Sequence, residues 1–283
     1  MRRSATPQAA RSLLAGILIR SFLIQILFQF QILGCACAVE REASTRYLTA
    51  PQAARDRART MKPTYVDFLT SVHTSTKRDY LARVNEFPKA EAATLAKKFD
   101  REYWDGARHT GYGGYTYDGR WRVVAEKIAA HYQLTPGMRV LDVGCGKAFL
   151  LYDLTQVVPG LEVAGIDVST YGIEHAKPEV RNSLQIAHAN ALPFPDQSFD
   201  LVISINTLHN LYCFDLERAL QEIVRVGRGS SQYICVESYR NEAEKANLLY
   251  WQLTCEAFFT PDEWRWWYDR ANYTGDYSFI YFE

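Results

Sequence analysis

The sequence lacks the features that mark several familiar protein classes. None of its six cysteines forms a C-x-x-C pair, so their spacing gives no support to a metal site, and reduced thiols fit better than disulfides. There is no internal repeat beyond a short PQAAR echo at 7–11 and 51–55. These absences argue against a structural zinc site, a disulfide framework and a repeat array.

Net charge is also lacking, because 32 basic residues balance 32 acidic ones. The balance is uneven along the chain. Residues 1–60 contain nine Arg, no Lys and three acidic residues, which leaves 23 basic and 29 acidic residues in 61–283. An acidic body argues against a nucleic-acid backbone as the main partner.

No uninterrupted apolar run reaches bilayer length. Residues 12–34 are apolar but contain Arg20 and three Gln, and only 14 residues separate Arg20 from Cys35, against about 20 needed to span a bilayer. The stretch is similar to a signal peptide or a poor membrane anchor. The arginine-only composition and the PQAAR echo favour the other interpretation, in which residues 1–60 are a leader outside the fold. We expect a cytoplasmic protein; the alternative is membrane anchoring through 12–34.

The remaining chain divides into two predicted parts. Residues 61–119 contain two predicted helices, 63–84 and 88–103, followed by a lid rich in Gly and Tyr, so we expect a helical cap with a lid. Residues 120–283 begin with a predicted helix at 120–132 and then alternate between strands and helices, as in a parallel α/β sheet. The expected strands are the VLDVG run that starts at residue 140, then 161–167, one near 184–189, 199–205 and 231–238, with a final strand-like tail at the sheet edge. The expected helices are 149–158, 171–178, 215–225, 241–259 and, from a capping box, 260–271.

The stretch VLDVGCGKAFLL, residues 140–151, predicts a strand that turns tightly into a helix whose N-terminus faces a ligand. A dinucleotide fingerprint would place a third glycine where this chain has Phe149, whose ring would push helix and strand apart. Asp142 would repel a pyrophosphate but would favour an ammonium or sulfonium group. S-adenosylmethionine carries both, and the helix N-terminus can accept its carboxylate.

Taken together, these motifs resemble the class I, Rossmann-like S-adenosylmethionine-dependent methyltransferases of the methyltransferase domain 11 type, over about residues 120–283. The resemblance implies a doubly wound seven-stranded sheet whose last strand is antiparallel, with the cofactor across the C-terminal ends of the first strands. It places Asp167 on the ribose hydroxyls and Asn190 with Ala191 at the adenine edge. Lys147 is expected to face solvent. The cofactor-binding residues expected in this way are Asp142, Gly144, Cys145, Gly146, Asp167, Val168, Asn190, Ala191 and Asn206.

The acceptor side is less defined by the sequence. Tyr112, Tyr115 and Tyr117 are candidates for a lid over the sulfonium, and Tyr115 is a catalytic candidate because an aromatic face stabilises a cation. His209 follows the fourth strand of the motif and could accept a proton from the substrate. Glu237 and Arg240, after the fifth strand, could reach the substrate, and the guanidinium of Arg240 would suit a carboxylate or phosphate.

We therefore expect methyl transfer from S-adenosylmethionine to a small-molecule acceptor, with no metal and no nucleic acid. Two alternatives stay open: a catalytically silent protein that binds the cofactor or acts as a scaffold, and a nicotinamide-dependent oxidoreductase. The acceptor, the acceptor atom and the oligomeric state do not follow from the sequence.

Overall fold

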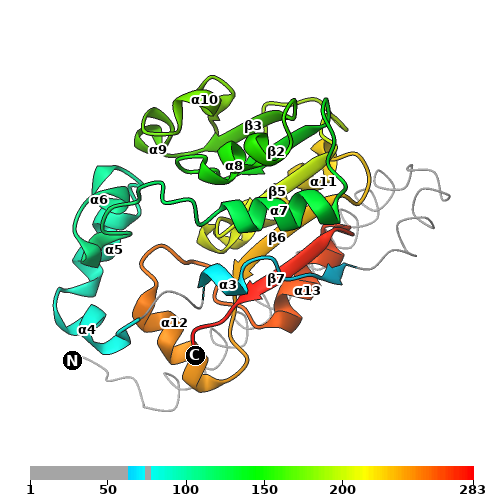
Figure 1. Ribbon diagram of the computed structural model, residues 1–283. Helices are drawn as coiled ribbons and strands as arrows, with labels where there is room; N and C mark the ends of the chain where they lie inside the picture. Colours follow the sequence, from blue (N-terminus) through cyan, green and yellow to red (C-terminus); the bar gives the residue numbers. More distant parts are fainter. Residues whose placement is uncertain (1–62, 74–77) are drawn as a thin grey trace, which may run out of the picture. The chain divides into compact units, whose positions relative to one another are not determined.

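The computed structural model describes residues 63–73 and 78–283. They belong to one compact unit, Ala58–Glu283, which Figure 1 shows as a sheet between layers of helices. The predicted leader, residues 1–60 with the apolar stretch 12–34, lies outside the described residues. Within the described ranges, every helix is too short or too polar to cross a membrane.

Seven strands form one sheet in the order β1-β7-β6-β5-β2-β3-β4, and every neighbouring pair is parallel. Parallel strands run as nearly continuous apolar segments because both of their faces are covered. All five residues of β5 are accordingly buried. The strand bounds are β1 Thr64–Tyr65, β2 Arg139–Val143, β3 Glu162–Asp167, β4 Leu184–Ile186, β5 Leu201–Ile205, β6 Gln232–Glu237 and β7 Asp276–Ile280.

Helices cover both faces of the sheet and create two cores. Alternate strand residues such as Val140 and Leu201 pack with α7 (Arg122–His131), α8 (Phe149–Val157) and α12 (Glu242–Trp251). Their neighbours Leu141 and Val202 pack on the other face, with α11 (Cys213–Val226) and α13 (Pro261–Arg270). Two short helices, α9 (Thr170–Glu174) and α10 (Pro178–Arg181), connect β3 to β4. This confirms the Rossmann-like α/β architecture expected from the sequence.

The expected direction of the last strand is wrong. β7 runs parallel to β6, with Tyr233 opposite Asp276, and it lies between β6 and β1 rather than at the sheet edge. The connection between β6 and β7 contains α12 and α13, and a helical crossover of this kind returns the chain parallel to the strand that it left.

The N-terminal part contains several short elements in place of the two long helices predicted from the sequence, and its first residues pack into the core of the sheet. It consists of β1, α3 (Thr70–His73), α4 (Tyr80–Asn85), α5 (Lys89–Ala96) and α6 (Arg101–Trp104). Phe68 and Leu69, between β1 and α3, are 4% and 3% exposed and lie in the core beneath α7 and α8. The start of the predicted cap, 61–119, therefore belongs to the sheet and its core.

Near the C-terminus the predicted helix 241–259 ends early, at Trp251. The backbone N–H groups of Glu256 and Ala257 donate to the carbonyl of His209, so they are not available for hydrogen bonds within a longer helix. The capping box at the next helix is confirmed: Thr260 and Glu263 exchange side-chain and backbone hydrogen bonds at the start of α13.

Candidate functional site

The turn after β2 has the shape predicted from its glycines. Gly144 and Gly146 have φ of +86° and +53°, in the left-handed region that favours glycine. Space is restricted as well, because a Cβ on Gly144 would lie 2.0 Å from Oγ1 of Thr207, and one on Gly146 would lie 2.6 Å from the ring of Trp104. The two glycines allow the turn to sit between the loop after β5 and a tryptophan from α6.

Asp167, at the end of β3, is attached to this turn. Its carboxylate accepts the backbone N–H of Gly146 at 2.7 Å and that of Ser169 at 2.8 Å. The residue is 8% exposed. Burial raises the pKa of Asp167, while backbone hydrogen bonds from Ser169, Gly146 and Val168 oppose that rise. Asp167 also lines the cavity described below, where its remaining lone pairs can accept hydrogen bonds from a ligand.

Asp142, in β2, is the second carboxyl group of the site and is 5% exposed. It makes no side-chain hydrogen bond to any residue that the structure describes. Burial, reinforced by the charge of Asp167, raises its pKa to about 7. Two buried acids that face one cavity make the site suitable for a cationic ligand, since a cation would stabilise both carboxylates.

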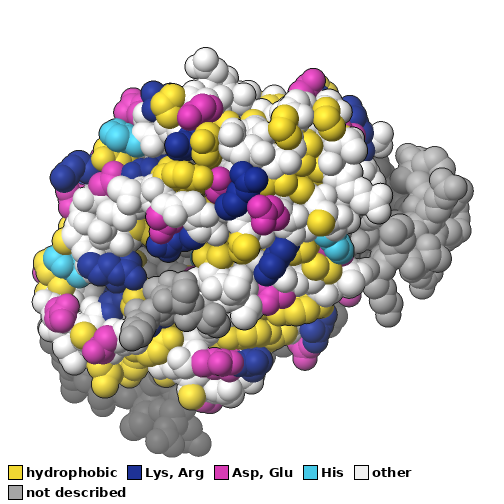
Figure 2. All heavy atoms as spheres, viewed as in Figure 1, with side chains coloured by type: hydrophobic (Ala, Val, Ile, Leu, Met, Phe, Trp, Pro, Cys, Tyr) yellow, Lys and Arg dark blue, Asp and Glu magenta, His cyan; other side chains and the backbone are white. Residues whose placement is uncertain are grey.

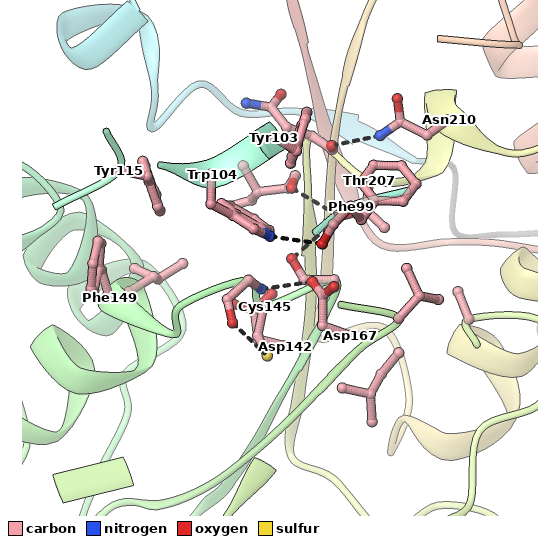
Figure 3. Close-up of a pocket in the computed structure, with 18 of the residues that line it drawn as sticks. Phe99, Tyr103, Trp104, Tyr115, Asp142, Cys145, Phe149, Asp167, Thr207 and Asn210 are labelled. Atoms are coloured by element: carbon pink, nitrogen blue, oxygen red, sulfur yellow. Dashed lines mark hydrogen bonds between the residues drawn. The ribbon is translucent and has the colours of Figure 1, made fainter. Parts of the chain in front are cut away.

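These groups line a cavity of about 190 Å³ at the C-terminal ends of β2, β3 and β5. Figure 3 shows Asp142, Asp167 and Cys145 on one side of it and the rings of Trp104, Tyr115 and Phe149 around it. The crevice at the carboxyl ends of parallel strands is where α/β folds of this type bind their ligands.

Aromatic side chains from the predicted lid cover this cavity. The indole N–H of Trp104 donates to Oγ of Ser169 at 2.8 Å, so α6 is fixed onto the loop after β3. Tyr112 stacks on Trp104 with ring centroids 5.5 Å apart, and Tyr115 stacks on Phe149 at 5.0 Å. The tyrosines of the lid thus contact Trp104, which lies against Gly146, and Phe149 at the start of α8.

The prediction that Lys147 faces solvent is wrong. Lys147 is 4% exposed, and its Nζ donates to both carboxylate oxygens of Asp105 at 2.8 and 2.7 Å and to the carbonyl of Tyr115 at 2.8 Å. Asp105 also accepts from the hydroxyl of Tyr171 at 2.9 Å. Burial alone would raise the pKa of Asp105, but the hydrogen bonds from Lys147 and Tyr171 hold it below its ordinary value. Lys147 therefore connects the glycine turn to the lid.

Two of the residues assigned to the adenine edge lie outside the cavity wall. The side chain of Asn190 donates to Asp215 at the start of α11, at 2.6 Å. Neither Asn190 nor Ala191 lines the cavity, whereas the three preceding residues, Ala187, His188 and Ala189, do. The other predicted residues that line it are Asp142, Gly144, Cys145, Gly146, Asp167, Val168 and Asn206.

A second cavity of about 480 Å³ adjoins the first. The two have four residues in common, which form a shared wall: Tyr103, Tyr112, Tyr115 and Asn206. Asn206 holds a left-handed φ of +56°, and its side-chain oxygen is buried without a hydrogen-bond partner. A buried amide oxygen without a partner costs free energy unless a ligand supplies the donor.

His209 lines the second cavity, but both of its ring nitrogens face Glu237. Its Nδ1 accepts the backbone N–H of Glu237 at 3.2 Å, so Nε2 carries the proton and lies 3.5 Å from Oε2 of the same residue. Burial lowers the pKa of His209 to about 3 and raises that of Glu237 to about 8. A neutral imidazole held in this way positions Glu237; its nitrogens are not directed at a substrate.

Two acceptor-side candidates, Arg240 and Tyr117, line neither the first nor the second cavity. The ring of Tyr117 does contact that of Phe149, which lines the first cavity. The guanidinium of Arg240 is paired with Glu244 and Glu283. Tyr117 donates to Asp153 at 2.6 Å, on α8. Both side chains have protein partners in the structure.

Several residues of the site carry no motif that sequence reasoning could use. Trp104, Ser169 and Thr207 shape the glycine turn, yet each acts through a contact with a distant part of the chain. Trp104 offered a weak signal, since it directly precedes the glycine-rich lid. Among the residues that the structure describes, no group of three or more His, Cys, Asp or Glu side chains is placed to hold a metal ion.

The sequence of the chain is similar to those of known methyltransferases. Residues 141–235 match the family model described as "Methyltransferase domain". A demethylmenaquinone methyltransferase of Symbiobacterium thermophilum is 34% identical over 128 residues, which cover 42% of this chain and 50% of that protein. One of Listeria monocytogenes is 30% identical over 147 residues, covering 50% and 58%. The chain thus spans about half the length of the curated relatives that it matches.

Among solved structures, the YcgJ protein from Bacillus subtilis aligns with a TM-score of 0.44 and 21% identity, over 52% of this chain and 66% of that one. The MccD protein aligns with a TM-score of 0.42 and 19% identity, over 51% and 68%.

Proposed function

We propose that this chain transfers a methyl group from S-adenosylmethionine to a small-molecule acceptor, and the match of residues 141–235 to the methyltransferase-domain family model supports this proposal. The observation that carries the proposal is the placement of Asp142 and Asp167 around one cavity beside the glycine turn. A sulfonium and an ammonium group would find two carboxylates there, and the ribose would find the free lone pairs of Asp167.

The residues present fit such a cofactor. Gly144 and Gly146 leave the turn without side chains, and the start of α8 offers its N-terminus to a carboxylate. In this proposal Asp167 holds the ribose, Asp142 lies near the positive groups, and Ala187 to Ala189 border the base. When bound, the cofactor supplies an already activated methyl group.

The protein then has to orient the acceptor and exclude water, which can lower a barrier by about 7–11 kcal/mol. The second cavity is the proposed acceptor site, because Tyr103, Tyr112, Tyr115 and Asn206 border both cavities. Rings at this wall would lie beside the positive sulfonium, where a cation–π contact contributes about 0.5–2 kcal/mol. Glu237 replaces His209 as the candidate to exchange a proton with the acceptor; it can accept one only in its ionised form, which its raised pKa of about 8 favours above pH 8. His209 is then its positioning residue.

The curated relatives support a small-molecule acceptor, since those quoted above are named for methylation of demethylmenaquinone. A nicotinamide cofactor fits less well, because Phe149 occupies the position of the third glycine and stacks on Tyr115. The catalytically silent alternative keeps the same cavity and differs only in turnover.

Isothermal titration with S-adenosylmethionine, S-adenosylhomocysteine and NADH tests the proposal. We expect the first two to bind, and Asp167→Ala to weaken binding about 10- to 100-fold, from the loss of hydrogen bonds to a charged group. Asp196→Ala is the matched control, because this aspartate is exposed and lines neither of the two cavities. Preferential NADH binding, or equal affinity in Asp167→Ala, would contradict the proposal. Formation of S-adenosylhomocysteine with an acceptor distinguishes an enzyme from a silent binder.

A further inference from the structure

The second cavity is unusual in its charge. Four arginines line it: Arg78, Arg83, Arg108 and Arg120. The acidic residues of its wall are Asp118 and Glu237. Asp118 is paired with Arg120, and the burial of Glu237 favours its neutral form near pH 7. The wall therefore carries a surplus of positive charge within a chain whose residues 61–283 are acidic in sum.

Three of these arginines surround one ring. The guanidinium carbons of Arg78, Arg83 and Arg108 lie 5.3, 4.5 and 5.0 Å from the ring centroid of Trp251, at the end of α12. The arginines come from separate segments, with Arg83 on α4 and Arg108 at the start of η1 (Arg108–Thr110), in the lid. In Figure 2, Lys and Arg side chains gather at the left of the face shown, where α4 to α6 lie.

Backbone carbonyls hold two of these arginines in place without neutralising them. Arg83 donates to the carbonyls of Trp251 at 2.7 Å and Arg108 at 2.9 Å. Arg108 in turn donates to the carbonyls of Gly111 at 2.9 Å and Tyr112 at 3.1 Å. Within the described part of the chain, neither Arg83 nor Arg108 forms an ion pair with a carboxylate, and each keeps N–H groups without a hydrogen bond.

Keeping like charges together in a partly closed space costs free energy. Burial, and then the nearby charge of Arg108, lowers the pKa of Arg83 to about 10. An anion beside both guanidinium groups would remove this cost and would gain charge-assisted hydrogen bonds. A fixed pair of guanidinium groups in a cavity is the arrangement that proteins use to bind carboxylates and phosphates.

We propose that Arg83 and Arg108, with Trp251, form the binding site for an anionic group, a carboxylate or a phosphate, on the methyl acceptor. The inference rests on the proposed function, because it places the acceptor in the second cavity. Its anionic group would lie at the arginines, and its reacting atom would lie at the wall shared with the first cavity. The sequence had offered Arg240 for this role, but Arg240 is neutralised by two glutamates.

The test measures binding of three small probes of similar size at low ionic strength: benzoate, phenyl phosphate and uncharged benzamide. We expect at least one anion to bind at least tenfold more tightly than benzamide and to weaken as salt is added. The tighter of the two anions identifies the group that is recognised. Similar affinities for all three probes would overturn the inference.

Variants locate the site. Arg108→Gln and Arg83→Gln should each weaken anion binding about tenfold or more, whereas Arg83→Lys should keep part of it. Arg122→Gln, an exposed arginine paired with Glu126 on α7, is the control. Because Arg83 is half-buried, circular dichroism checks that each variant folds, and Arg108→Gln, an exposed position, carries the test if Arg83→Gln does not fold. Anion binding that survives in folded Arg108→Gln overturns the inference.

Titration with S-adenosylmethionine on the same samples separates this inference from the proposed function. If the cofactor binds but the anions do not, the acceptor site is wrong and the proposed function stands. If the anions bind at the arginines but the cofactor does not bind, the proposed function fails and the anion site remains.

Discussion

At the scale of single residues, the two acids of the first cavity behave differently from exposed carboxylates. Asp142 has its pKa raised to about 7 by burial and by the charge of Asp167. A raised pKa means that the folded protein binds more protons than the unfolded chain, so this group lowers stability as the pH rises from about 4 to 7. A bound cation reverses the preference, because it favours the ionised form.

We therefore predict that S-adenosylmethionine binds more tightly as the pH rises from 5.5 to 7.5. Below about pH 7 the amino group of the cofactor stays largely protonated, so the change in that part of the range reports the protein. The affinity should rise several-fold, and protons should be released on binding near pH 6, measured by calorimetry in buffers of different ionisation enthalpy. Asp142→Asn should flatten the pH dependence, whatever its absolute affinity. A dependence that is unchanged in Asp142→Asn would assign the titration to another group.

Gly146 gives a second prediction at this scale. Gly146→Val requires a β-branched side chain at φ +53° and a Cβ 2.6 Å from Trp104, so Trp104 has to move. Cofactor binding should be lost, at a cost in thermal stability. The double variant Gly146→Ala with Trp104→Phe tests the cause, because the smaller ring should restore stability relative to Gly146→Ala alone. No difference between these two variants would show that backbone strain, not Trp104, limits the position.

At the scale of elements, the βαβ succession between 139 and 237 follows closely from the sequence. Its strands were predicted within two or three residues, because continuous apolar runs and capping signals are local. The direction of β7 was not predicted correctly, because it depends on how the connection through α12 and α13 crosses the sheet. Likewise, the partner of Lys147 lies 42 residues away on the lid, and that of Trp104 lies 65 residues away. No local pattern encodes such pairs.

The bond between Lys147 and Asp105 predicts how the lid moves relative to the glycine turn. Lys147→Met and Asp105→Asn should each speed proteolytic cleavage of residues 105–119 about tenfold, and the double variant should add little, because both changes remove the same link. Arg101→Met, which breaks an exposed ion pair with Glu102 on α6, is the control. S-adenosylhomocysteine should slow cleavage of the parent protein. Additive effects of the two single variants would show that they act separately.

At the scale of the whole molecule, the segment before the lid is part of the folding unit. β1 pairs with β7 through Thr64 and Tyr65, and the ring of Phe68 lies 4.8 Å from that of Tyr233 and 5.4 Å from that of His131. The sequence had suggested a cap outside the sheet. The structure instead places Phe68 in the same core as β2, β5 and β6, so the cooperative unit should include β1.

We predict that the fragment 61–283 folds and binds S-adenosylmethionine, and that a fragment starting at Arg78 is far less stable. Without β1, the outer edge of β7 is left without a hydrogen-bonded neighbour. Without Phe68, the ring of Tyr233 loses one of its packing partners. Phe68→Ala in the full chain should cost about 3–5 kcal/mol of unfolding free energy, as for other buried phenylalanines, whereas Leu81→Ala, at a position that is 59% exposed, should cost little. Urea unfolding with and without the cofactor is measured for the two fragments, the two variants and the unchanged full chain. If the fragment from Arg78 unfolds at the same urea concentration as 61–283, residues 63–73 are an appendage. If 61–283 is insoluble or fails to bind while the full chain binds, residues 1–60 contribute to the folded protein, and anchoring through 12–34 becomes the interpretation to test.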